Sequence, residues 1–143
     1  MKAFGAVHDI VAGSGLPAGL IDLVYLRVSQ LNGCAYCLDV HGRDLLKHGM
    51  PVEKLVLVQA WRESGALFTA EEQAALAWAE TVTLVTATHV NDAEYDAALA
   101  TFGDKALADL TVAIALINAY NRLAISFRAE PAAARARRAA SAA

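Results

Sequence analysis

The sequence predicts an all-α fold, a single-domain helical bundle that assembles into an oligomer. Nearly every segment carries apolar residues at helical spacing, and the breaks between segments contain helix caps rather than hairpin turns. A length of 143 residues suits one domain with one core. Hydrophobic residues make up 57% of the chain, more than a compact domain of this size buries within itself, so we expect a homo-oligomer.

Four helices are expected in the first half of the chain, with proline and glycine at their ends. Pro17 and Pro51 each suit the first turn of a helix, where the missing amide hydrogen costs nothing. Gly49 suits the left-handed residue that follows a helix. The expected helices cover approximately residues 4–12, 17–31, 34–48 and 51–62.

Two capping patterns mark helix starts in the second half. The pairs Thr69–Glu72 and Asn91–Glu94 each have the spacing of a capping box. The helix that begins after Asn91 is expected to close at Gly103, and the last helix should cover about residues 104–127. The segment 85–90 is rich in β-branched residues and could equally form an extended linker.

The helical domain is expected to span residues 1–130, followed by an Ala/Arg-rich tail at 131–143. The tail is either a frayed helix or a disordered end. The chain has a net charge of -3 and its basic cluster lies in this tail, which argues against nucleic acid as a partner. Charged residues interrupt every apolar run before the roughly 20 residues of a membrane span, and no signal peptide is evident. We therefore expect a cytoplasmic protein that does not bind membranes.

Both cysteines of the chain belong to one short motif, Cys34-x-x-Cys37-x-x-x-His41. Spacings of three and four place these side chains on one face of a helix, within about two turns. A helix N-terminus, a second sulfur and a nearby imidazole are each expected to favour the reactive thiolate. In the cytoplasm a pair with this spacing is more often catalytic than structural. The motif therefore predicts thiol-disulfide chemistry.

Two other interpretations of the motif are open. Two thiolates and an imidazole could bind zinc, but His48 lies about 10 Å beyond His41 along the helix, so His89 or another chain would have to supply the fourth ligand. Alternatively, both cysteines are buried packing residues and His41 is a satisfied core histidine. Within the dithiol interpretation, the helix dipole favours Cys34 as the attacking sulfur whereas His41 favours Cys37.

A polar cluster interrupts the last apolar helix, and it consists of Asn118, Asn121 and Arg122. Buried polar groups need hydrogen-bond partners. We expect these residues to form a structural or interface network rather than to contact a substrate.

Several segments of the chain share the pattern of one known family. They are residues 21–24, residues 27–37 with His41, and residues 60–63, 76–80 and 118–123. Together they resemble the AhpD-like branch of the carboxymuconolactone decarboxylase family, although Tyr36 stands where many members have a histidine between the cysteines. The resemblance implies an AhpD-like helical bundle that forms trimers or hexamers.

The resemblance also implies a peroxidase or disulfide-reductase cycle without metal, flavin or another cofactor. A small hydroperoxide or disulfide would react at Cys37, Cys34 would close the disulfide, and a lipoyl-type or thioredoxin-like dithiol would reopen it. His41 would relay a proton with an upstream acid, and Asp22 stands where the family usually has glutamate. Two alternatives are a decarboxylase of the wider family that uses His41 as acid or base, and a non-catalytic redox-sensing module.

Overall fold

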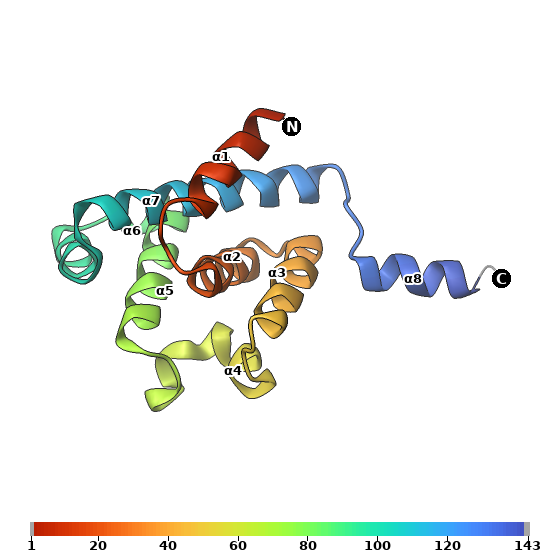
Figure 1. Ribbon diagram of the computed structural model, residues 1–143, viewed down its shortest axis with the longest axis horizontal. Helices are drawn as coiled ribbons and strands as arrows, with labels where there is room; N and C mark the ends of the chain where they lie inside the picture. Colours follow the sequence, from red (N-terminus) through yellow and green to blue (C-terminus); the bar gives the residue numbers. More distant parts are fainter. Residues whose placement is uncertain (1, 142–143) are drawn as a thin grey trace.

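The computed structural model describes residues 2–141 and shows a bundle of helices (Figure 1). Within those residues the chain contains no β-strand, which confirms the all-α prediction. None of the described helices is both long enough and apolar enough to cross a membrane. The α-helices and 3-10 helices (η) are α1 (Lys2–Ala12), α2 (Ala18–Asn32), α3 (Ala35–Lys47), α4 (Val52–Leu57), η1 (Val58–Glu63), η2 (Gly65–Leu67), α5 (Ala70–Thr83), α6 (Val85–Thr88), α7 (Asp92–Ser126) and α8 (Ala132–Ser141).

Helix α2 lies at the centre of the bundle. It packs against α3, α5 and α7, and α1 lies against α7 (Figure 1). Its side chains are buried around most of its circumference, and Leu23, Val24 and Val28 have no exposed surface. A helix enclosed in this way has no face to give to water, which explains why α2 is apolar nearly all round.

Glycine and capping residues begin and end the helices where the sequence predicts. Gly49 follows α3 with a φ of 85°, and Gly33 between α2 and α3 has a φ of 71°. The capping box Thr69–Glu72 forms both of its hydrogen bonds at the start of α5. Gly103 interrupts α7 with a φ of 71° and a ψ of 171°, so α7 consists of two helical segments, as expected.

The helix predicted over residues 51–62 is shorter than expected. Helix α4 ends at Leu57, and the chain tightens into the 3-10 helix η1, in which Ala60 leaves the helical region with φ −119° and ψ 30°. Val58 and Trp61 are both buried in an apolar cluster with side chains of α2 and α5. Tertiary packing of these two side chains therefore overrides the local α-helical pattern.

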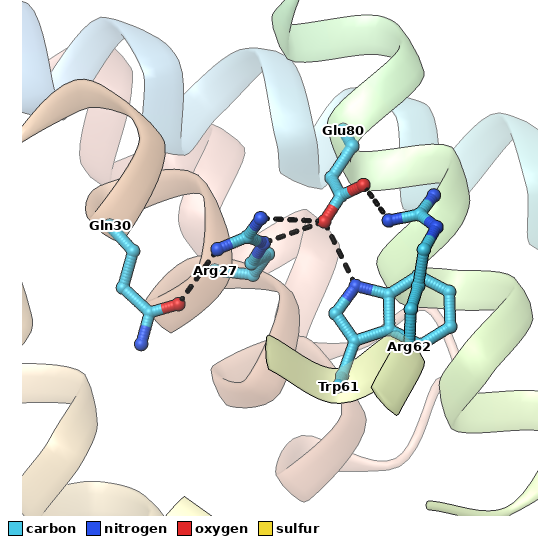
Figure 2. Close-up of polar contacts among 5 residues, drawn as sticks. All are labelled: Arg27, Gln30, Trp61, Arg62 and Glu80. Atoms are coloured by element: carbon cyan, nitrogen blue, oxygen red, sulfur yellow. Dashed lines mark hydrogen bonds and ion pairs between the residues drawn. The ribbon is translucent and has the colours of Figure 1, made fainter. Parts of the chain in front are cut away.

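The carboxylate of Glu80, on α5, joins η1 to α2 and α5 (Figure 2). It accepts hydrogen bonds from Arg27 at 2.7 Å and from the indole of Trp61 at 2.9 Å, and it pairs with Arg62. Arg27 also donates to Gln30 at 3.2 Å. Burial by itself raises the pKa of Glu80, but the hydrogen bonds from Trp61, Arg62 and Arg27 outweigh it and hold the pKa below its ordinary value.

The segment 85–90 is not an extended linker. It forms the short helix α6 (Val85–Thr88), after which His89 and Val90 adopt the left-handed conformation with φ of 52° and 49°. The hydroxyl of Thr88 donates to the carbonyl of Thr81 at 2.8 Å and holds this turn against α5. A local side-chain hydrogen bond therefore outweighs the β-propensity of the segment.

The Ala/Arg-rich tail is helical over the part that the structure describes, as α8. Figure 1 shows α8 projecting away from the bundle. At its start the amide of Ala132 donates to the carboxylate of Asp39 on α3 at 2.8 Å. The disordered alternative is therefore wrong for residues 132–141, and residues 142 and 143 lie outside the described part of the chain.

Candidate active site

The predicted motif lies at the start of α3, immediately after Gly33 reverses the chain. Cys34 is the N-cap residue of α3, with an extended backbone, and its Sγ accepts a hydrogen bond from the amide of Cys37 at 3.4 Å. The sulfur thus takes the place of the oxygen in the usual capping residues. This cap brings both cysteines into the first turn of α3, as their spacing predicts.

Both cysteines are free thiols, and Cys34 and Cys37 are only 1% and 4% exposed. Cys34, Asn121 and Ser29 lie close enough to the Cys37 thiol to act on its pKa through hydrogen bonding. Burial, followed by the hydrogen bond with Cys34, raises the pKa of Cys37 to about 12, although Asn121 and Ser29 act in the opposite direction. The expectation that the site favours the thiolate is therefore wrong for Cys37, because desolvation outweighs the helix terminus.

His41 contacts a carboxylate on the neighbouring helix α2. Its Nδ1 lies 3.1 Å from Oδ1 of Asp22, and both side chains are mostly buried. The other oxygen of Asp22 lies 3.2 Å from Nδ1 of His48. One carboxylate therefore contacts two histidines, His41 on α3 and His48 at the C-cap of that helix. The ring of Tyr25 meets the imidazole of His41 edge to face, with 4.9 Å between centroids.

Two stripes of polar side chains face each other between α2 and α3, and each has spacings of three and four. The α3 stripe contains Cys34, Cys37 and His41, and the α2 stripe contains Asp22, Tyr25 and Ser29. The stripes touch where Asp22 meets His41 and where Ser29 meets Cys37. Sequence reasoning missed Tyr25 and Ser29, although polar residues at helical spacing in an apolar helix were a usable signal.

A cavity of about 570 Å³ opens beside the motif. Among the described residues that line it are Cys37 and His41, whereas Cys34 is not one of them. The rest of the lining is mainly apolar and aromatic, and it includes Tyr25 and Phe127. A cavity of this size and character suits a small organic molecule. Of the two sulfurs, Cys37 is therefore the one placed to meet such a molecule.

The polar cluster of α7 belongs to the same site. The side chain of Asn121 is fully buried, accepts from Asn32 at 2.9 Å and donates to Ser29 at 3.0 Å. Asn118 accepts from the same Asn32 amide at 2.9 Å. The predicted network is confirmed, but the contact between Asn121 and Cys37 was not foreseen because α3 and α7 meet only in the fold.

One group among the described residues could hold a metal ion. Asp22, His41 and Asp44 each place a ligand atom within 4.8 Å of the others. Carboxylate and imidazole ligands suit divalent first-row metals. This set differs from the thiolate set considered for zinc, and Asp44 is already paired with Lys47 at 2.6 Å. An ion bound there would occupy the two side chains that pair beside Cys37.

Comparison with known proteins relates the chain to one family. The model of the carboxymuconolactone decarboxylase family matches residues 1–81. The uncharacterized protein YdfG of Bacillus subtilis is 35% identical over 105 residues, which cover 73% of this chain and 71% of YdfG. The alkyl hydroperoxide reductase AhpD of Hyphomonas neptunium is 36% identical over 62 residues, 43% of this chain and 33% of that protein.

A solved structure extends the likeness to almost the whole fold. ATU0492 from Agrobacterium tumefaciens, a protein of unknown function described as a candidate AhpD antioxidant defence protein, superposes with a TM-score of 0.87. The two chains are 37% identical, and the match covers 91% of this chain and 88% of that one. The chain therefore belongs to the carboxymuconolactone decarboxylase family and is similar to its AhpD-like members.

Proposed function

We propose that this protein is a thiol-dependent peroxidase of the AhpD type, a disulfide oxidoreductase that works through Cys37, Cys34, His41 and Asp22. One observation carries the proposal: Cys37 and His41 line an apolar cavity together, while the second thiol, Cys34, is in contact with Cys37. The arrangement provides a sulfur that a substrate can reach and a second sulfur that can resolve it.

The proposed cycle begins with a small organic hydroperoxide. The Cys37 sulfur attacks the terminal peroxide oxygen, so that an S–O bond forms as the O–O bond breaks and the alkoxide leaves. Cys34 then attacks the sulfenic acid and releases water, which leaves a Cys34–Cys37 disulfide. A dithiol donor, of the lipoyl or thioredoxin-like kind, exchanges with this disulfide and restores both thiols. No metal or organic cofactor takes part.

His41 and Asp22 handle the proton in this cycle. Because burial raises the pKa of Cys37 to about 12, the thiol is protonated at neutral pH and needs a base when the peroxide arrives. Asp22 accepts from Nδ1 of His41, which leaves Nε2 free to take the thiol proton and return it to the departing alkoxide. The proton of the thiol therefore ends on the alcohol product.

The substrate and assembly complete the proposal. The mainly apolar lining favours an organic hydroperoxide over hydrogen peroxide. Large exposed apolar side chains, among them Ile125 and Phe127, favour a homo-oligomer. We propose that this oligomer is a trimer or hexamer, as the family resemblance implies, and that the protein is cytoplasmic. The tail that begins at residue 131 forms α8, which projects from its own bundle (Figure 1). In the proposed oligomer this helix contacts a neighbouring subunit.

Trapping of the sulfenic acid tests the proposal. In Cys34→Ser, one equivalent of cumene hydroperoxide should leave a sulfenic acid that dimedone labels at Cys37, whereas Cys37→Ser should give no label and no turnover. Labelling of Cys34 in the Cys37→Ser protein would reverse the assigned roles. Absence of labelling in both variants would contradict a peroxidase.

Two further assays distinguish the peroxidase from the alternative functions, a decarboxylase and a non-catalytic redox sensor. A decarboxylase would keep its activity in the Cys34→Ala/Cys37→Ala double variant, and a sensor would oxidise without steady-state turnover. The cavity argues against the decarboxylase, because no arginine or lysine stands among its described lining residues to bind a carboxylate substrate.

A further inference from the structure

The hydroxyl of Tyr25 is the one buried side-chain nitrogen or oxygen without a hydrogen-bond partner among the described residues. Tyr25 lies on α2 and is only 2% exposed. Buried phenol groups normally find a partner, because a lost hydrogen bond to water is otherwise not replaced. An unpaired donor in the middle of the molecule therefore needs an explanation.

The position of Tyr25 supplies that explanation. The residue lines the cavity that Cys37 and His41 also line, and its ring packs edge to face against the imidazole of His41. Asp22 is near enough for its charge to act on Tyr25, but the Tyr25 hydroxyl makes no hydrogen bond to it. Burial, followed by the charge of Asp22, raises the pKa of Tyr25, so the group remains a protonated donor.

We propose that Tyr25 is a further catalytic residue, whose hydroxyl donates a hydrogen bond to the peroxide oxygen that becomes the alkoxide when Cys37 attacks. The proposal rests on the proposed function and adds to it a hydrogen-bond donor that has no partner of its own in the mainly apolar cavity. Negative charge develops on that oxygen as the O–O bond breaks, and a fixed donor in a dry site stabilises it. Tyr25 keeps its own proton, since the proton that forms the alcohol comes from the Cys37 thiol through His41.

Tyr25→Phe isolates this hydrogen bond, because it removes one oxygen and leaves the ring against His41. With cumene hydroperoxide and dihydrolipoamide, we expect kcat/KM to fall about 10- to 100-fold. The melting temperature should stay equal or rise, since the removed hydroxyl has no partner in the free protein. The matched control is Tyr95→Phe, at an exposed tyrosine outside the cavity, which should stay within about twofold of wild type.

Two further measurements separate the outcomes. Alkylation of Cys37 by iodoacetamide should be unchanged in Tyr25→Phe, which shows that the thiol and cavity are intact. Binding of cumyl alcohol, the product, should weaken in Tyr25→Phe and not in Tyr95→Phe. Wild-type rate and alcohol binding in Tyr25→Phe would overturn the role of Tyr25 alone. A wild-type protein that consumes no hydroperoxide would overturn the peroxidase, and unaltered alcohol binding would still decide against Tyr25.

Discussion

Asn121 provides a sharp test of how the fold controls the reactive sulfur. In Asn121→Ala, the fully buried Ser29 loses its donor at 3.0 Å, and Asn32 loses one of two acceptors. A buried polar group left without its partner costs about 1–3 kcal/mol. Asn32 keeps its bond to Asn118, whereas Ser29 keeps only its contact with the Cys37 thiol, so we expect a loss of about 1–3 kcal/mol in the free energy of unfolding.

The same substitution should make the Cys37 thiol harder to ionise. Asn121 lowers the pKa of Cys37, so its removal raises that pKa further, and the pH at which iodoacetamide reacts with Cys37 should move upward. Asn118→Ala is the matched control, because it breaks bonds to Asn32 and Thr83 in the same network and has no contact with Cys37. Urea unfolding and alkylation of both variants, each in a Cys34→Ser background, give the comparison. Equal alkylation profiles would refute the link between the network and the thiol.

Three other predictions follow from the structure. Glu80→Gln should lower the free energy of unfolding in urea at pH 7 by about 2–4 kcal/mol, because it leaves Arg27 buried without a carboxylate. Since the folded state lowers the pKa of Glu80, wild type should lose stability as the pH falls below the ordinary glutamate pKa, and Glu80→Gln should not show this contribution. Burial raises the pKa of Cys37 from 9.0 to about 12, so the folded state holds that proton more tightly; stability should fall from pH 9 towards 12 by up to about 1.4 kcal/mol per pH unit, and Cys37→Ser should remove this slope. Asp22→Asn should lower hydroperoxide consumption at least about tenfold without unfolding the protein, because His41 loses the anion that orients it; a wild-type rate would exclude the relay.

Much of the fold could be predicted because the residues that begin and end its helices act locally. Gly33, Gly49 and the capping box at Thr69 act within a few residues, so the sequence pattern specifies them. The conversion of residues 58–63 to a 3-10 helix was not predictable in this way, since it depends on the packing of Val58 and Trp61 against side chains of α2 and α5. Periodicity within one helix carries no information about such contacts between helices.

In the site, too, contacts within one helix could be predicted from the sequence, whereas contacts between helices could not. Cys34, Cys37 and His41 share one helix, so their spacing alone brings them together. The contacts of Asp22 and Asn121 depend on how α2 and α7 pack against α3, and only the resemblance to a family indicated Asp22. The sequence predicted a lowered pKa for Cys37, and this prediction was wrong. The helix terminus is a local feature that the sequence reveals, whereas the burial that raises the pKa depends on the whole fold.

Thiol counting under denaturing conditions tests the central claim most directly. Before oxidation the wild-type protein should contain two free thiols, and one equivalent of cumene hydroperoxide should remove both together, with dihydrolipoamide restoring both. Retention of both thiols, or loss of one with sulfinic acid on Cys37 and no disulfide, would contradict a cycle that passes between Cys34 and Cys37.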